Sequence, residues 1–236
     1  MSNFKIQFKY LVPNLFTALC LTSGVFAIYY ILNENYTIAS LLVALSMLCD
    51  GLDGKLARLL NASSKFGSFF DTISDYIAFG IVPAFLSYMA VIHKFSPLAI
   101  FVIILYLGCG AYRLTRFMKK TVTLDKKKPF IGLPIPTAAG MIASYILLTD
   151  KLGKTGGPPV LLVSIILFIS FLMVSHIQYL PLELKLKKIT IQSGIFYLLA
   201  ILSLIFSFQY YYLIFIFWIV LYIVYGLFRY FIISLK

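Results

Sequence analysis

Apolar runs of about 20 residues recur from one end of the chain to the other, separated by short polar or basic segments. A helix of that length crosses the ~30 Å hydrocarbon core of a bilayer, so each run predicts a transmembrane helix. We place eight spans, at residues 14–32, 38–59, 67–91, 96–118, 134–150, 159–177, 193–207 and 210–232. The pattern predicts an all-α fold: a polytopic transmembrane helical bundle of about eight spans, forming one membrane-embedded domain over residues 1–236.

The first twelve residues carry a shorter, amphipathic pattern. Apolar side chains recur at helical spacing, with polar and basic side chains on the other faces, before Pro13 interrupts the helix. The apolar positions are Phe4, Phe8, Leu11 and Val12. We therefore predict an N-terminal interfacial amphipathic helix over residues 1–12, lying on the membrane surface. The alternative is a disordered basic tail.

Composition agrees with a membrane protein and adds an orientation. Hydrophobic residues make up 61% of the chain and charged residues only 12%, which excludes an ordinary soluble globule. Of the 20 Lys and Arg residues, 17 fall on the side of the N-terminus, leaving only Lys94, Lys151 and Lys154 opposite. This asymmetry predicts that both termini face the cytoplasm. We expect the membrane to be the plasma membrane of a prokaryote. The net charge of +12 then reflects topology and attraction to membrane lipids, so nucleic acid is not an expected partner.

Acidic residues are scarce, yet half of them are clustered. The chain has eight Asp and Glu residues, and four of these lie between residues 50 and 75. A carboxylate inside a membrane is costly, so such a cluster requires cations or polar partners. Asp50 and Asp53 share one face of the second span, and Asp71 and Asp75 share one face of the third. A short connection makes the two spans antiparallel neighbours, so both acidic faces can meet across one cleft near the cytoplasmic surface.

Four converging carboxylates invite hard divalent cations, to which the diphosphate of a substrate can add further oxygen ligands. Glycine and alanine accompany the acids on the same helix faces, which removes bulk where a nucleotide approaches the backbone. The purely structural alternative pairs the acids in salt bridges with Arg58 and Lys65. Two cations do not balance four acids, so we favour a metal site.

The whole segment reads DGLDGKLARLLNASSKFGSFFDTISD, from Asp50 to Asp75. It matches D-x-x-D-G-x-x-A-R-x8-G-x3-D-x3-D at every fixed position and so resembles the CDP-alcohol phosphatidyltransferase family. The resemblance implies a six-span catalytic core over residues 14–177, with two additional C-terminal spans over residues 193–232. It also implies a homodimer with a site that faces the cytoplasm, and a CDP-lipid substrate, either CDP-diacylglycerol or CDP-archaeol.

The resemblance further implies roles for individual residues. The metal ligands are Asp50, Asp53, Asp71 and Asp75, and Asp75 additionally serves as the general base. The metal is Mg²⁺ or Mn²⁺, with two ions per site. The residues implied to border or hold the CDP moiety are Gly54, Ala57, Arg58 and Gly67. The reaction is direct attack of an acceptor hydroxyl with release of CMP, since nothing in the sequence indicates a covalent intermediate.

Three further segments resemble the phosphatidylserine synthase branch of the family: PNLFTALCLTSG from Pro13, GAYRLTRFMK from Gly110 and GLPIPTAAG from Gly132. The implied acceptor is L-serine. Arg113 and Arg116 lie one helical turn apart and could clamp its carboxylate, or they could anchor the span to headgroups. Asn14 could line the headgroup side of the cleft or cap a helix.

Two other interpretations remain open at this point. The same chemistry could use glycerol phosphate or inositol phosphate as the acceptor, because the basic segment after Arg113 could bind a second phosphate. A cation transporter with an intramembrane acidic site is the more distant alternative.

Overall fold

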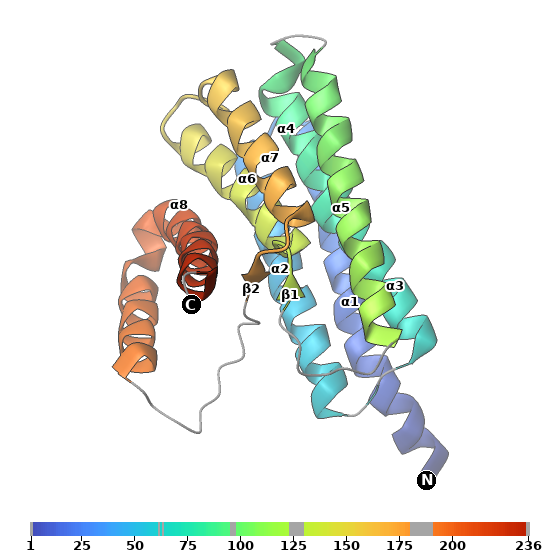
Figure 1. Cartoon of the computed structure of the whole chain (residues 1–236). Helices are drawn as coiled ribbons and strands as arrows, with labels where there is room; N and C mark the ends of the chain where they lie inside the picture. The colour runs from blue at the N-terminus through green and yellow to red at the C-terminus, as the bar shows by residue number, and fades with distance from the viewer. Residues whose placement is uncertain are drawn as a thin grey trace.

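The computed structural model describes residues 2–60, 62, 64–94, 98–122, 130–179 and 191–234. It is a helical bundle, which confirms the predicted all-α membrane fold (Figure 1). The helices in chain order are α1 (Ser2–Leu32), α2 (Tyr36–Leu59), α3 (Lys65–Asp75), the π-helix η1 (Tyr76–Ile81), α4 (Val82–Ala90), the 3₁₀ turn η2 (Ile92–Lys94), α5 (Leu98–Val122), α6 (Ile135–Lys151), α7 (Pro159–Val174) and α8 (Ile191–Ser234). Two short strands, β1 (Phe130–Ile131) and β2 (Gln178–Tyr179), pair antiparallel.

The first two helices of the bundle, α1 and α2, pack against each other as a long antiparallel pair (Figure 1). The Ser46 hydroxyl donates to the Cys20 carbonyl at 3.0 Å, and the Ser23 hydroxyl donates to the Leu42 carbonyl at 2.9 Å. Small hydroxyl side chains let helix backbones approach closely and satisfy polar groups where no water is available. These two bonds fix the rotation of α2 against α1, and with it the direction of the acidic face of α2.

Polar residues in the connections start the next helices. The Asn35 side chain accepts from the Ile38 N–H at 3.1 Å and begins α2. The Ser64 hydroxyl accepts from the Gly67 N–H at 2.9 Å and begins α3. Both are N-caps of the kind that satisfy an otherwise unpaired backbone donor. The second cap sets where α3 begins, so it sets the height of its acidic residues in the bundle.

Five stretches among the described residues are long and apolar enough to span a membrane: Lys9–Leu32, Tyr36–Leu59, Phe66–Ala90, Ile100–Met118 and Tyr210–Ile232. Helix α7 is apolar but shorter, and α6 also falls below this length. The structure therefore does not establish the expected number of eight spans.

The prediction that Pro13 interrupts the first helix is wrong. Helix α1 runs from Ser2 to Leu32 with Pro13 inside it, so residues 2–12 and the first span form one continuous helix. Proline removes one backbone donor, and such a loss is tolerated in membrane helices when nearby groups satisfy the freed partners. Thr17 lies one helical turn further along, and its hydroxyl oxygen is 3.2 Å from the Pro13 carbonyl oxygen.

The third predicted span is not one regular helix. It divides into α3, the π-helix η1 and α4, which follow one another without a break in the chain. Within this region the Val82 N–H donates to the Ile77 carbonyl, five residues back instead of four. The turn therefore holds one additional residue and changes the rotation of α3 relative to α4.

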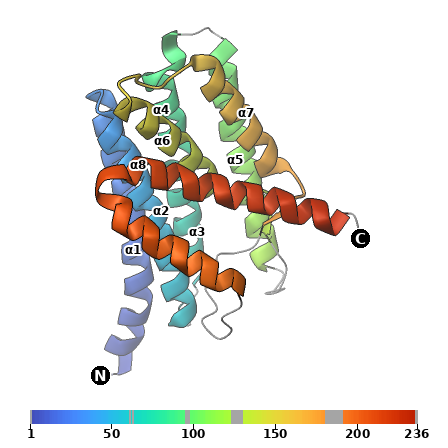
Figure 2. The ribbon, with the colours of Figure 1, turned by 90° about the vertical axis from the view of Figure 1, so that its left-hand side faces the viewer.

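Helix α8 bends at Tyr210, whose φ of −121° and ψ of 28° are not helical. The bend lies next to the predicted division between residues 193–207 and 210–232. Figure 2 shows the two segments of α8 crossing the bundle at a steep angle to α1 and α2. Gly140 permits this close crossing, because a Cβ at that position would lie 2.5 Å from Cδ1 of Ile219.

The strands β1 and β2 lie between the ends of α5 and α7 and the second segment of α8 (Figure 1). Tyr179 in β2 is fully buried and stacks on Tyr222 of α8, with ring centroids 5.7 Å apart. Its ring also packs on Gly226, where a Cβ would lie 2.2 Å away. Burial raises the pKa of Tyr179 to about 12, so this phenol stays neutral at physiological pH.

Candidate active site

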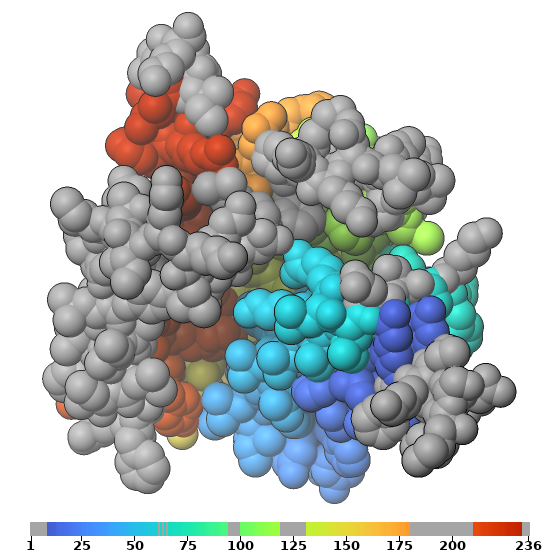
Figure 3. Space-filling model, turned by 90° about the horizontal axis from the view of Figure 1, so that it is seen from below, coloured from blue at the N-terminus to red at the C-terminus, as the bar shows by residue number. Residues whose placement is uncertain are grey.

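The structure brings three of the four predicted acids into one cluster. Asp50 and Asp53 come from α2 and Asp71 from α3, and each offers a carboxylate oxygen within 4.8 Å of the others. Figure 3 views the end of the bundle that carries the N-terminus, where the last turns of α2 lie beside α1. The cluster therefore forms between α2 and α3, each of which packs more closely against α1 than against the other.

Asp75 lies next to this cluster, one helical turn beyond Asp71. Its carboxyl group is in hydrogen-bonding contact with that of Asp50. Two ionised carboxylates in contact repel each other, and a bound cation would relieve this repulsion. Asp75 is therefore close enough to Asp50 for the two carboxyl groups to act on one ligand.

Thr17 is a site residue that sequence reasoning missed. Its hydroxyl donates to Oδ2 of Asp53 at 2.8 Å, and both side chains are buried. The bond ties the acidic cluster to α1 and fixes the direction of the Asp53 carboxylate. Thr17 stands in the segment PNLFTALCLTSG, three residues after Asn14, so its position on the same helix face was the available signal.

The cluster fits a hard divalent cation by its chemistry. All of its donors are carboxylate oxygens, which suit Mg²⁺ and Mn²⁺, and no histidine or cysteine belongs to the described group. Bringing three such groups together costs free energy through mutual repulsion unless positive charge is present. The three acids thus form a group that could bind a metal ion.

The small residues of the motif lie around the acids, and the free space beside their backbone differs from one to the next. A Cβ at Gly54 would meet no atom within 4 Å, so the backbone of α2 is accessible there. Ala57, one turn further, is partly buried. At Gly67 the space is narrow, because a Cβ would lie 3.1 Å from Oδ1 of Asn14. The side chain of Asn14 therefore reaches the start of α3, beside the acidic cluster.

The purely structural alternative paired the acids with Arg58 and Lys65. The Arg58 side chain is exposed, and its Nε donates to the Gly54 carbonyl of its own helix at 3.0 Å. The side chain of Lys65 lies outside the described residues.

The two predicted serine-binding arginines have different surroundings. Arg113 is only 8% exposed, and its electrostatic partners include Asp75, Asp50 and Tyr222. Arg116 instead donates to a group of backbone carbonyls at the end of α7 and in β1. These are Val174 at 3.1 Å, Met173 at 3.2 Å, Ser175 at 3.4 Å and Ile131. The structure thus places Arg113 toward the acids and Arg116 toward the connection between α5, β1 and α7.

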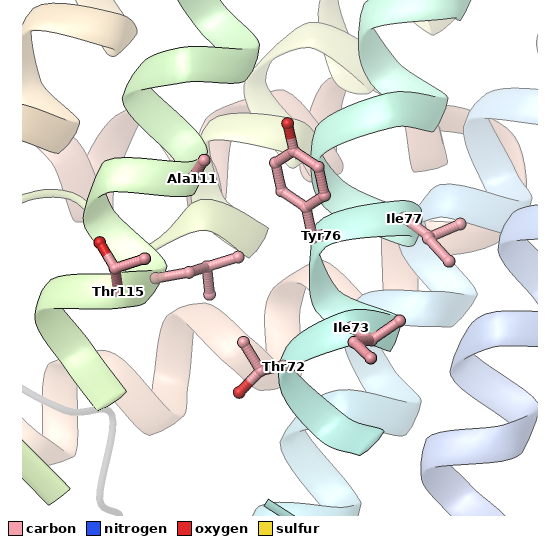
Figure 4. A pocket seen from close by; sticks show the side chains of 7 residues that line it. Thr72, Ile73, Tyr76, Ile77, Ala111 and Thr115 are labelled. Atoms are coloured by element: carbon pink, nitrogen blue, oxygen red, sulfur yellow. The ribbon is translucent and has the colours of Figure 1, made fainter. Parts of the chain in front are cut away.

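A cavity of about 210 Å³ lies between α3, η1 and α5 (Figure 4). Its lining consists of Thr72, Ile73, Tyr76, Ile77, Ala111, Leu114 and Thr115. None of the four aspartates lines it. The cavity lies on another side of α3 from the acidic cluster, and we assign it no part in the chemistry.

A sequence profile of CDP-alcohol phosphatidyltransferase matches residues 10–178. The chain belongs to this family. A CDP-diacylglycerol–serine O-phosphatidyltransferase of Helicobacter pylori is 41% identical over 199 residues, which are 84% of this chain and 82% of that protein. The protein of that name from Bacillus subtilis is 32% identical, covering 71% of this chain and 89% of the relative. An archaetidylserine synthase of Methanothermobacter thermautotrophicus is 36% identical, covering 76% and 73%.

Membership of the CDP-alcohol phosphatidyltransferase family confirms the resemblance drawn from the motif. The matched region includes all four aspartates and both arginines and ends before α8. Together with the long apolar helices, it identifies the chain as an integral membrane protein.

Proposed function

We propose that this protein transfers the phosphatidyl or archaetidyl group of CDP-diacylglycerol or CDP-archaeol to the hydroxyl of L-serine and releases CMP. The observation that carries the proposal is the convergence of Asp50, Asp53 and Asp71 within 4.8 Å, with Asp75 beside them. Relatives named as serine phosphatidyltransferases and as archaetidylserine synthase support serine as the acceptor and leave the lipid chains open.

Asp50, Asp53 and Asp71 would hold two divalent ions, Mg²⁺ or Mn²⁺, and Asp75 would complete their ligands. Such ions neutralise a diphosphate and stabilise the charge that develops on its leaving oxygen. Asp75 is also the proposed general base, because it is adjacent to the cluster and can accept the proton of the serine hydroxyl. A bond then forms between the serine oxygen and the lipid phosphorus, while the bond from that phosphorus to CMP breaks.

Arg113 is the proposed ligand of the serine carboxylate. It is buried beside Asp75, so a carboxylate held by its guanidinium would bring the serine hydroxyl toward the general base. Arg116 remains a predicted partner of the same carboxylate, although its carbonyl contacts support a role in joining α5 to α7.

The remaining motif residues are proposed to bind the CDP-lipid. The open backbone at Gly54 provides room for the nucleotide, and Ala57 keeps the following turn small. Gly67 lets Asn14 approach the start of α3, where an amide can bond to the headgroup side of the lipid. Arg58 would lie at the outer edge of this surface and balance phosphate charge.

The deciding experiment measures CMP release by the purified protein. CDP-diacylglycerol and CDP-archaeol are each supplied with serine, glycerol phosphate or inositol phosphate, in the presence of Mg²⁺ or Mn²⁺. We expect CMP release with serine, and near-complete loss of it in each of the four Asp→Asn variants while the protein stays folded. CMP release with a phosphorylated acceptor instead of serine would refute serine as the acceptor. Cation flux without lipid turnover would favour the transporter.

Orientation and assembly follow the same resemblance and have their own tests. Both termini and the acidic cluster are proposed to face the cytoplasm of a prokaryotic cell, in a homodimer. Cysteine labelling in whole cells should then find position 65 protected and position 154 accessible to a membrane-impermeant reagent. Labelling of both positions from the same side would contradict the orientation, and a monomer by cross-linking in membranes would contradict the dimer.

A further inference from the structure

The π-helix η1 begins at the residue after Asp75, so a change of helical register directly adjoins the acidic cluster. Single π turns inside α-helices insert one residue and occur often at functional sites. Helix α4, on the far side of the turn, packs against α1, α2, α5 and α6. Most of its residues are buried, so its rotation is fixed by the core of the bundle.

The inserted residue decides which way the acids of α3 point. At about 100° per residue, one inserted residue rotates α3 by about 100° relative to α4. With the π turn present, a carboxylate oxygen of Asp71 lies within 4.8 Å of those of Asp50 and Asp53. A regular α-helix between α3 and α4 would therefore turn Asp71 and Asp75 by about 100° away from Asp50 and Asp53.

Pro83 and Tyr106 together explain why the π turn is stable at this point in the helix. Proline has no N–H, so Pro83 cannot donate to the carbonyl of Phe79 four residues earlier, as an α-helix requires. The hydroxyl of Tyr106 on α5 supplies the missing donor at 2.6 Å. Both Tyr106 and Phe79 are fully buried, and an unpaired carbonyl there would be costly.

We propose that Tyr106 is a positioning residue of the active site: by bonding to the Phe79 carbonyl, to which Pro83 cannot donate, it holds the π turn that directs Asp71 and Asp75 at Asp50 and Asp53. The consequence for metal binding depends only on the acidic cluster. The consequence for turnover rests on the proposed function as well.

The chain offers a matched control on the other side of the same contact. Tyr76 reaches from η1 to α5, where its hydroxyl lies 3.5 Å from the Leu107 carbonyl. Leu107 lies inside α5, where its carbonyl also has an intrahelical donor, so this bond is long and dispensable. Tyr76→Phe and Tyr106→Phe therefore each remove one hydroxyl group between η1 and α5. Only the second removes a donor from a buried carbonyl to which the residue four positions later cannot donate.

A compensating change separates positioning from simple stabilisation. In the double variant Tyr106→Phe with Pro83→Ala, the new backbone N–H can bond to the Phe79 carbonyl, and the segment can relax to a regular α-helix. Stability should then recover, but the acids should be rotated away from α2. A purely structural role of Tyr106 predicts that stability, metal binding and activity recover together.

The experiment measures three quantities in detergent for the wild type and these variants: the melting temperature, the Mn²⁺ affinity from the EPR signal of the free ion, and CMP release. We expect Tyr106→Phe to weaken Mn²⁺ binding about tenfold and to lower kcat at least as much, with KM for CDP-lipid nearly unchanged. The double variant should regain the melting temperature only. Tyr76→Phe should resemble the wild type.

Wild-type Mn²⁺ affinity and turnover in Tyr106→Phe would overturn the proposal, and so would full recovery of both in the double variant. Wild-type protein that binds no Mn²⁺ would also overturn it, because the acids would then form no metal site to be positioned. If the wild type binds Mn²⁺ but releases no CMP with any acceptor, the proposed function fails while the Mn²⁺ measurements still decide the role of Tyr106.

Discussion

Replacing each arginine of the α5 pair by lysine should separate two roles that look equivalent in the sequence. Arg113→Lys keeps the positive charge beside Asp75 and Asp50 but removes the planar fork that can hold a carboxylate through two bonds. Arg116→Lys keeps a charge near the end of α7 but leaves several carbonyls with fewer donors. The first change should affect serine use, and the second should affect stability.

The magnitudes follow from the bonds that each substitution removes. A charge-assisted hydrogen bond contributes about 1.5–3 kcal/mol, so losing one at Arg113 should raise the serine concentration for half-maximal rate by roughly ten- to a hundredfold. Arg116 makes bonds of 3.1, 3.2 and 3.4 Å besides that to Ile131. Lysine can replace only part of this set, so we expect about 1–3 kcal/mol of destabilisation.

The assay records CMP release against serine concentration and, separately, against CDP-lipid, together with the melting temperature of each variant. Arg113→Lys should shift the serine curve without changing the CDP-lipid curve or the melting temperature. Arg116→Lys should lower the melting temperature and leave the serine curve nearly in place. Unchanged serine dependence in Arg113→Lys would refute its role as a carboxylate ligand. A large serine effect in Arg116→Lys would restore the two-arginine clamp.

Two further predictions use pairs of residues on one helix. Gly54→Ala should weaken CDP-lipid binding without loss of stability. Gly51→Ala, which also enters open space but at a variable position of the motif, should leave binding unchanged. Equal effects in a nucleotide-binding measurement would exclude contact at Gly54. Thr17→Val should raise the Mg²⁺ concentration for half-maximal activity about ten- to a hundredfold, because Asp53 loses its 2.8 Å bond. The control is Thr22→Val, because the Thr22 hydroxyl donates to the Leu19 carbonyl of its own helix. A matching response in both variants would contradict a role for Thr17 in orienting Asp53.

Much of the fold could be predicted because the length and hydropathy of an apolar run indicate a membrane helix. The predicted limits of the second span, residues 38–59, agree with α2, which runs from Tyr36 to Leu59. The limits are clear because a polar N-cap at Asn35 begins the helix. The interruption at Pro13 was wrong, because a proline lowers helix propensity locally but does not end a helix that neighbouring groups support.

The acidic cluster was predictable within each helix and less so between helices. The spacing of Asp50 and Asp53 fixes their common direction on α2, since a regular helix turns by a constant angle per residue. The bond from Thr17 to Asp53 joins residues 36 positions apart, so no local pattern contains it. The buried bond from Tyr106 to Phe79 likewise depends on how α5 lies against η1.

The sequence by itself determined the family, the membrane-embedded helices and the four acids, because apolar length and periodic spacing are properties of one helix at a time. Only the tertiary structure decided the rotation of Asp71 and Asp75 toward α2, because the π turn after Asp75 breaks the constant angle on which helical spacing relies. It also decided the separate surroundings of Arg113 and Arg116. The two arginines are one helical turn apart on α5, yet Arg113 faces Asp75 and Arg116 faces the end of α7. These neighbours belong to helices distant in the sequence, so only the packing of the helices decides them.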